Sequence, residues 1–140
     1  MRPKLIPLRD FKLPHMVSIH GANRPRAYLR SMIAELINKD RQGFSDLMAR
    51  NKVDKLYAFG SSVHGPFTPT SDVDVYLDVN EPDDLRRGTV LMNLWDGLER
   101  FFGRRVDLLT DNSLRNPVLR NEVLRTMKLI YDGSRREVLV

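Results

Sequence analysis

The chain has 140 residues, no cysteine and a formal net charge of +5 at pH 7. This length suits one domain around one hydrophobic core, and a chain without cysteine forms neither disulfides nor thiolate metal sites. Pro7, Arg9, Asp10 and Lys12 interrupt the basic amino-terminal segment before an apolar run can form. We therefore expect neither a secretory signal nor a membrane span, and predict a cytoplasmic protein. Lysine and arginine are scattered without a groove-reading motif, so direct nucleic-acid binding is not expected.

The first half of the chain predicts an arm, two helices and a strand. Residues 1–23 mix prolines with scattered charges and show no hydrophobic period, so we expect an extended or disordered arm. Pro25 is typical of a first helical turn, and the apolar residues after it recur at helical spacing. A shorter helix is expected from about residue 42 to residue 50. The apolar run that Gly60 ends predicts a buried strand from residue 53 to residue 59.

The second half predicts two helices and three strands. Residues 71–79 alternate between apolar and polar side chains, as a half-buried strand does. After a turn at residues 81–83, a long helix with an apolar side should end at Gly103, before a strand at residues 104–109. Asn116 and Pro117 favour a last helix, followed by a closing strand at 127–133 and a frayed tail at 134–140. This order predicts one α/β domain over residues 24–133, with a mixed sheet of about four strands backed by helices.

Two aspartates project from one face of the strand predicted at residues 71–79. Asp72 and Asp74 are two positions apart, so their Cα atoms should be about 6.5 Å apart on the same side. At a charge separation of about 5 Å and an effective dielectric constant near 20, two carboxylates repel by roughly 3 kcal/mol. A proton or a divalent cation would relieve this repulsion, and oxygen ligands without Cys or His favour Mg²⁺ or Mn²⁺. The alternative is that the two acids only end a solvated strand beside a turn.

A turn of glycine and serine precedes the two aspartates. Gly60, Ser61 and Ser62 offer close backbone approach, amide groups and hydroxyls, which suit the phosphates of a nucleotide. The spacing from Gly60 to Gly65 resembles a P-loop, but Pro66 and Phe67 stand where that motif requires lysine and then serine or threonine. The sequence therefore excludes a Walker-type site.

A third acid lies in the strand predicted at residues 104–109. Asp107 has an apolar residue on each side, and it would face the same site if this strand lies beside the strand at residues 71–79. Three converging carboxylates can hold two Mg²⁺ ions for an in-line phosphoryl displacement. The alternative is a strand-end acid that forms an ion pair with Arg104 or Arg105.

Three motifs together resemble one known family. They are Leu-Tyr-Ala-Phe-Gly-Ser at residues 56–61, Ser-Asp-Val-Asp-Val at residues 71–75, and Arg-Arg-Val-Asp-Leu-Leu at residues 104–109. They look like the minimal nucleotidyltransferases (MNT) of the DNA polymerase β superfamily, and the resemblance spans about residues 28–133. It implies a polymerase β-like fold and a nucleotidyltransferase that transfers AMP from ATP. It also implies a HEPN-domain protein as the partner in a toxin–antitoxin module, with a hydroxyl of that partner as the acceptor and this chain as the antitoxin.

The resemblance implies roles for five residues of this chain. Gly60 and Ser61 would bind the triphosphate of ATP. Asp72 and Asp74 would bind Mg²⁺ or Mn²⁺ ions. Asp107 would complete the metal site and help to activate the acceptor hydroxyl.

One position departs from the family pattern. The family often has Arg or Lys just before the second glycine of the turn, where this chain has His64. A neutral histidine binds phosphate less strongly than arginine does, and His64 is either a phosphate contact or a solvated loop residue. This departure supports a second hypothesis, a non-catalytic binding module that neutralises its partner by covering it. The three intact acids favour the enzyme.

Overall fold

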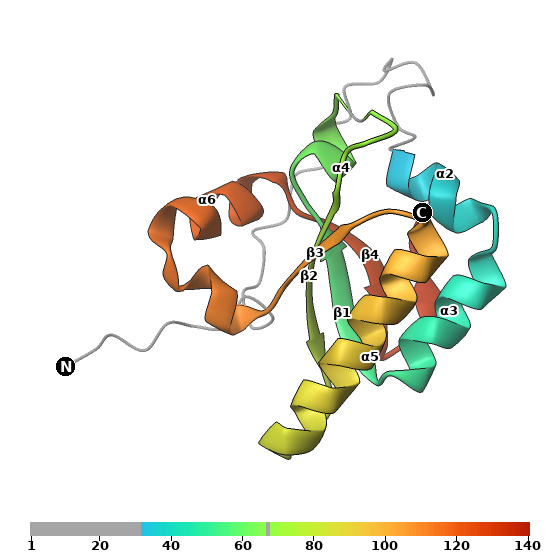
Figure 1. The fold of residues 1–140 in the computed structure, drawn as a ribbon, viewed down its shortest axis with the longest axis vertical. Coiled ribbons are helices and arrows are strands. Elements are labelled where there is room, and N and C mark those ends of the chain that lie inside the picture. Colours follow the sequence, from blue (N-terminus) through green and yellow to red (C-terminus); the bar gives the residue numbers. More distant parts are fainter. Residues whose placement is uncertain (1–31, 67) are drawn as a thin grey trace.

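The computed structural model describes residues 32–66 and 68–140. The arm predicted at residues 1–23 and the helix start predicted at Pro25 lie outside the described residues. The described part forms a five-stranded sheet with helices on both faces (Figure 1). Its elements are α2 (Met32–Asn38), α3 (Arg41–Arg50), β1 (Val53–Ala58), α4 (Ser61–His64), β2 (Val73–Val79), α5 (Asp84–Phe102), β3 (Val106–Leu109), the 3₁₀ helix η2 (Asp111–Arg115), α6 (Pro117–Thr126), β4 (Lys128–Asp132) and β5 (Glu137–Val138).

The strands lie in the order β3-β2-β1-β4-β5. β1 pairs antiparallel with β2 and with β4, whereas β2 and β3 are parallel. Parallel neighbours need a long crossover connection, and α5 supplies it. The predicted mixed α/β sheet is confirmed, with five strands in place of about four. No helix in the described ranges is long and apolar enough to cross a membrane.

The extra strand comes from the segment predicted to be a frayed tail. β5 pairs antiparallel with β4, and Val138 is buried in the core. The guanidinium of Arg41, on α3, donates to the carbonyl oxygens of Val138 and Val140. The prediction for residues 134–140 was wrong because these tertiary contacts hold the segment against the sheet. No local sequence pattern indicates them.

One face of the sheet packs against α2, α3 and α5 (Figure 1). The apolar side chains that alternate along β2 point into this layer, as predicted for that face. Aromatic rings fill the space between α3 and α5. The ring centroid of Phe44 lies 5.4 Å from that of Phe101 and 6.2 Å from that of Phe102. The helix predicted from about residue 42 to residue 50 and the long helix that ends before Gly103 are therefore confirmed as core helices.

The opposite face of the sheet is also covered, by η2 and α6 (Figure 1). Tyr57 and Tyr76 pack there, with ring centroids 5.9 Å apart, against Leu114 and Val123. Tyr76 is only 1% exposed. The half-buried strand predicted at residues 71–79 is therefore buried on both faces over most of its length, because η2 and α6 cover the side that carries the polar residues.

α5 also protects the edge of the sheet. β3 is an edge strand, so one row of its backbone groups has no neighbouring strand. Trp95 Nε1 donates to the carbonyl oxygen of Val106 at 2.8 Å, and the carboxylate of Glu99 accepts from the amide of Val106 at 3.0 Å. The spacing of Trp95 in the sequence places it with the apolar side of this helix, but it is 41% exposed. Its indole lies at the edge because it satisfies a strand carbonyl there.

Candidate active site

The parallel pairing of β2 with β3 brings two of the three predicted acids together. Asp74 and Asp107 are partners in the register of these strands. Paired residues of neighbouring strands project from the same face, so the two carboxylates lie side by side. Asp74 is partly buried and Asp107 is exposed at the sheet edge. The expectation that the strand of Asp107 lies beside the strand of Asp74 is confirmed.

The electrostatics of Asp74 reflect these neighbours. Burial raises the pKa of Asp74 to about 6, and the charge of Asp107, a hydrogen bond with that carboxyl and the charge of Asp72 contribute in the same direction. The sequence predicted repulsion between Asp72 and Asp74, but the larger charge contribution comes from Asp107 and that of Asp72 is the smallest of these causes. The site therefore favours either a proton on Asp74 or a cation beside it.

Asp72 takes a less central place than predicted. It lies just before β2 rather than within it, and the next residue, Val73, donates its amide to the carbonyl oxygen of Arg105 at 2.9 Å. Within the described residues, no three Asp, Glu, His or Cys side chains converge closely enough to enclose a metal ion. Asp74 and Asp107 thus form the close pair, and Asp72 adds negative charge beside it. The binding of metal by all three acids stays a prediction.

The turn at Gly60 lies directly against Asp74. Gly60 has a φ of 61°, and a Cβ atom added there would lie 3.1 Å from Asp74 Oδ2. Only glycine adopts this backbone conformation readily and leaves that space open. The two halves of the predicted site, the glycine turn and the acidic strand, are therefore in contact.

Not every amide of the turn is available to a phosphate. The amide of Gly60 donates to Thr126 Oγ1 at 2.9 Å, and the amides of Val63 and His64 donate to the carbonyl oxygen of Gly60 at 3.1 Å. Ser61 and Ser62 are the first two residues of α4, where a helix offers no carbonyl to the backbone amides. Phosphate binding by Ser61 stays a prediction, and His64 is exposed at the end of α4.

Two hydroxyls support this turn through contacts that the sequence did not predict. Thr126, at the end of α6, accepts from Gly60 and donates to the carbonyl oxygen of Glu122 at 2.8 Å. Ser62 Oγ accepts from the amide of Asp74 at 2.9 Å. The sequence placed Ser62 among the hydroxyls of the glycine–serine turn, but not in contact with Asp74. No signal marked Thr126, because 66 residues separate it from Gly60.

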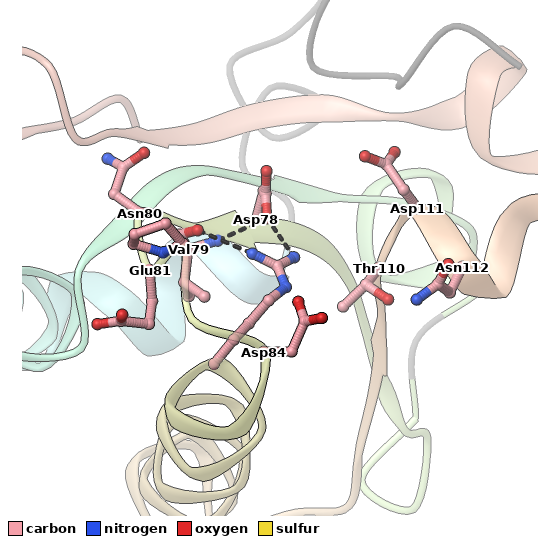
Figure 2. Close-up of a pocket in the computed structure, with 10 residues that line it drawn as sticks. Asp78, Val79, Asn80, Glu81, Asp84, Thr110, Asp111 and Asn112 are labelled. Atoms are coloured by element: carbon pink, nitrogen blue, oxygen red, sulfur yellow. Dashed lines mark hydrogen bonds and ion pairs between the residues drawn. The ribbon is translucent and has the colours of Figure 1, made fainter. Parts of the chain in front are cut away.

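The other end of β2 carries a different kind of acid. Asp78 is 3% exposed and forms an ion pair with Arg87 of α5. β3 pairs with β2 only as far as Tyr76, and beyond that point Arg87 donates to the carbonyl oxygen of Val79 at 2.9 Å. Asp78 lines a surface pocket of about 590 Å³, and Figure 2 shows Asp84 and Asp111 around the same pocket. This pocket contains none of the predicted site residues.

The alternative for Asp107, an ion pair with a neighbouring arginine, can be compared with the contacts of Arg104. Its guanidinium donates to the carbonyl oxygen of Thr68 at 2.8 Å and to that of Ser71 at 3.4 Å. Arg104 thus ties the loop before β2 to the start of β3. These contacts support the position of Asp72, which follows Ser71 directly.

Comparison with known families identifies the chain. Residues 44–136 match the family described as "Polymerase beta, Nucleotidyltransferase". This chain is a member of that family. The match includes β1, the Gly60 turn, β2 and β3, so the paired acids and the turn lie within the nucleotidyltransferase domain. The predicted family and enzyme class are confirmed.

Curated relatives of this nucleotidyltransferase come from Methanocaldococcus jannaschii. "Putative protein adenylyltransferase MJ0126" is 32% identical over 93 residues, which cover 66% of this chain and 89% of the relative. "Putative protein adenylyltransferase MJ1217" shows the same identity and coverage. The match therefore covers most of the length of each relative and about two thirds of this chain.

Two solved structures are similar to the nucleotidyltransferase at lower identity. One, described as "Crystal structure of the toxin-antitoxin with AMP-PNP", is 22% identical with a TM-score of 0.49, and the match covers 69% of this chain and 76% of that chain. A crystal structure of a toxin-antitoxin MntA-HpeT mutant is 21% identical with a TM-score of 0.46, covering 69% and 74%. The family match and the curated relatives, not these distant structures, identify the chain.

Proposed function

We propose that this nucleotidyltransferase transfers AMP from ATP to a hydroxyl of a partner protein, in a reaction that depends on Mg²⁺. The observation that carries the proposal is the pairing of Asp74 with Asp107 beside the Gly60 turn. The names of the curated relatives describe protein adenylyltransferases, which supports a protein as the acceptor.

The side chains of the site fit a hard divalent cation. Asp72, Asp74 and Asp107 offer only oxygen donors, which Mg²⁺ and Mn²⁺ prefer. The pKa of Asp74 is raised first by burial and then by the neighbouring carboxylates, so its ionised form is unfavourable. A cation bound there would stabilise that ionised form. When bound, Mg²⁺ would supply positive charge to offset the negative charge of the triphosphate.

The protein groups then have separate roles in the proposed transfer. The hydroxyl of Ser61 contacts the triphosphate, and Gly60 lets the phosphates approach the backbone. The acceptor oxygen forms a bond to the α-phosphorus, the bond from that phosphorus to the bridging oxygen breaks, and pyrophosphate leaves. Asp107, exposed at the sheet edge, orients the acceptor hydroxyl and takes up its proton.

The proposal extends to the partner through the motifs of the sequence. Their resemblance to the minimal nucleotidyltransferases supports a HEPN-type protein as the acceptor and a tyrosine as its modified residue. In this proposal the chain is the antitoxin of a cytoplasmic toxin–antitoxin module and inactivates its partner by AMPylation.

Mass spectrometry of the partner tests the proposed transfer. The full chain is incubated with Mg²⁺, ATP and a HEPN-type partner, and the partner is weighed intact. We expect a gain of about 329 Da for each AMP transferred. Asp74→Asn should abolish the gain, and so should chelation of the divalent cation.

A matched control is Asp46→Asn. Asp46 is an exposed acid of α3, which covers the opposite face of the sheet, so this variant should modify the partner at the parent rate. If the parent binds the partner tightly but adds no mass to it, the adenylyltransferase is rejected in favour of a non-catalytic binding module. A gain of equal size with Asp74→Asn would show that the paired acids are not the catalytic site.

A further inference from the structure

Ser62 lies between the Gly60 turn and the strand that carries Asp74. It is 1% exposed, and its Oγ accepts a hydrogen bond from the backbone amide of Asp74 at 2.9 Å. Phosphate binding is proposed for the preceding residue, Ser61, so the buried hydroxyl of Ser62 is not needed for that contact. Its partner is instead the backbone of a proposed metal ligand.

The hydrogen bond of Ser62 replaces a missing bond of the sheet. β1 and β2 pair as far as Ala58 and Val75, and the amide of Phe59 still donates to the carbonyl oxygen of Asp74 at 3.1 Å. In a regular antiparallel ladder, the amide of Asp74 would donate back to the carbonyl of Phe59. The chain leaves the strand at Gly60, however, and the amide of Asp74 donates to Ser62 Oγ.

The same short segment therefore holds the backbone of Asp74 at two points. Phe59 donates to its carbonyl oxygen and Ser62 accepts from its amide, and Gly60 leaves room for its carboxylate because it has no Cβ. A backbone held on both sides restricts the directions in which the carboxylate can point. The strand had to break at Gly60 to form the turn, and the hydroxyl of Ser62 compensates for that break.

We propose that Ser62 is a positioning residue that keeps the carboxylate of Asp74 directed toward the metal ions. This inference rests on the proposed function, because it takes Asp74 as a metal ligand. Without the hydroxyl, the amide of Asp74 loses its acceptor and the start of β2 can move relative to Asp107. Ser62 thus acts through Asp74 and contacts neither ATP nor the acceptor.

The test removes the hydroxyl and measures metal binding directly. In Ser62→Ala, binding of Mn²⁺ to the full chain is followed by electron paramagnetic resonance, and exchange of the Asp74 amide by hydrogen–deuterium exchange. We expect the Mn²⁺ dissociation constant to rise roughly tenfold, as for other groups that support a metal ligand. The Asp74 amide should exchange roughly tenfold faster, because its hydrogen bond is lost.

Two further variants control for a loss of folding. Ser62→Cys keeps nearly the same side-chain volume with a weaker acceptor, so its Mn²⁺ affinity should lie between those of the parent and Ser62→Ala. Ser113→Ala is the matched control, because Ser113 Oγ also accepts from a backbone amide, that of Thr110 at 3.2 Å, but does so in η2. It should leave Mn²⁺ affinity unchanged.

The outcomes separate this inference from the proposed function. If Asp74→Asn weakens Mn²⁺ binding while Ser62→Ala and Ser62→Cys leave it unchanged, the metal site stands and the positioning role of Ser62 is rejected. If Asp74→Asn itself leaves Mn²⁺ binding unchanged, the metal site of the proposed function is rejected, and the role of Ser62 with it.

Discussion

The two ends of β2 place the same side chain in opposite surroundings. Asp78 is buried at one end, where Arg87 forms an ion pair with it. Asp74 is partly buried four positions earlier, where its neighbour across the strands is another acid, Asp107. At the first end the fold supplies a cation, and at the second it supplies a second anion.

This difference distinguishes an acid whose charge the fold neutralises from an acid that the fold places beside another negative charge. Asp78 and Arg87 neutralise each other, so their contact serves the structure. At the other end, neutral hydroxyls hold the backbone: Thr126 accepts from Gly60, and Ser62 accepts from Asp74. These bonds hold the backbone of the site without neutralising its negative charge.

The largest expected effect on stability is at the end of β2 where Asp78 forms an ion pair with Arg87. Asp78→Asn leaves the guanidinium of Arg87 without its counter-charge, and we expect a loss of about 2–3 kcal/mol in the free energy of unfolding. This is below the usual cost of breaking a fully buried pair, because the Arg87 side chain is 26% exposed. Urea unfolding measures the loss. The exposed pair Asp96 and Arg100 provides the control, and Asp96→Asn should change stability by less than about 0.5 kcal/mol.

The comparison of the two ends of β2 also requires that Asp78 takes no part in catalysis. Asp78→Asn, assayed below its unfolding transition, should transfer AMP at the parent rate for each folded molecule. A large loss of activity in a fully folded Asp78→Asn protein would contradict the division between the two ends.

A smaller loss of stability is expected when the hydroxyl of Thr126, which supports the Gly60 turn, is removed. Thr126→Val keeps the shape of the side chain but leaves the amide of Gly60 without its acceptor. We expect a loss of about 1–2 kcal/mol in the free energy of unfolding, the usual cost of an unsatisfied, partly buried amide. Thr89→Val is the matched control, because Thr89 donates to a helix carbonyl on the exposed side of α5. Equal stability of Thr126→Val and the parent would show that the turn does not depend on this bond.

At the Asp74 end of β2, replacing the acid should raise the stability of the fold at neutral pH instead of lowering it. The fold raises the pKa of Asp74 from 3.8 to about 6, chiefly by burial. Its contribution to stability is therefore fully present below about pH 3.8 and is lost as the pH rises through about 6. In a metal-free buffer at pH 7.5, Asp74→Asn should be more stable than the parent. We expect about 1 kcal/mol, because solvent screens this partly exposed group.

Thermal unfolding from pH 4 to pH 7.5, with a chelator, measures this prediction. The advantage of Asp74→Asn should shrink toward pH 4, and Mg²⁺ should stabilise the parent more than the variant. An Asp74→Asn protein that is less stable than the parent at pH 7.5 would refute the repulsion. Asp46→Asn, on the opposite face of the sheet, should leave the pH dependence unchanged.

The smallest expected effect concerns the titration of Asp74 itself. Asp107→Asn removes one neighbouring charge, so the pKa of Asp74 should fall from about 6 toward 3.8. It should fall only part of the way, because burial is the largest cause of the shift. Carbon-13 NMR of the Asp74 carboxyl group measures it. An unchanged pKa would mean that the two carboxylates do not interact across the strands.

Local patterns predicted most of the elements and pointed to the candidate residues of the site. Alternation found β2, helical spacing found α5, and Asn116 with Pro117 marked the start of α6, where the Asn116 side chain accepts from the amide of Val118 at 2.9 Å. The acids and the glycine turn were found because their residue types are unusual at that spacing. Each of these signals depends on residues close together in the chain.

The errors came from contacts between distant segments. The segment at 134–140 forms β5 because β4 and Arg41 hold it, and neither contact leaves a local pattern. The polar face of β2 is buried because η2 and α6 cross over it. Thr126 supports the Gly60 turn from a distance of 66 residues in the chain.

The sequence by itself determined which groups the site contains, because the glycine turn and the three acids are defined by residue type and short spacing. Only the tertiary structure decided which of them meet. The parallel register of β2 and β3 placed Asp74 beside Asp107 and left Asp72 just outside the strand. The reason is physical: the register between strands is set by core packing on both faces of the sheet, and that packing involves residues from all parts of the described chain.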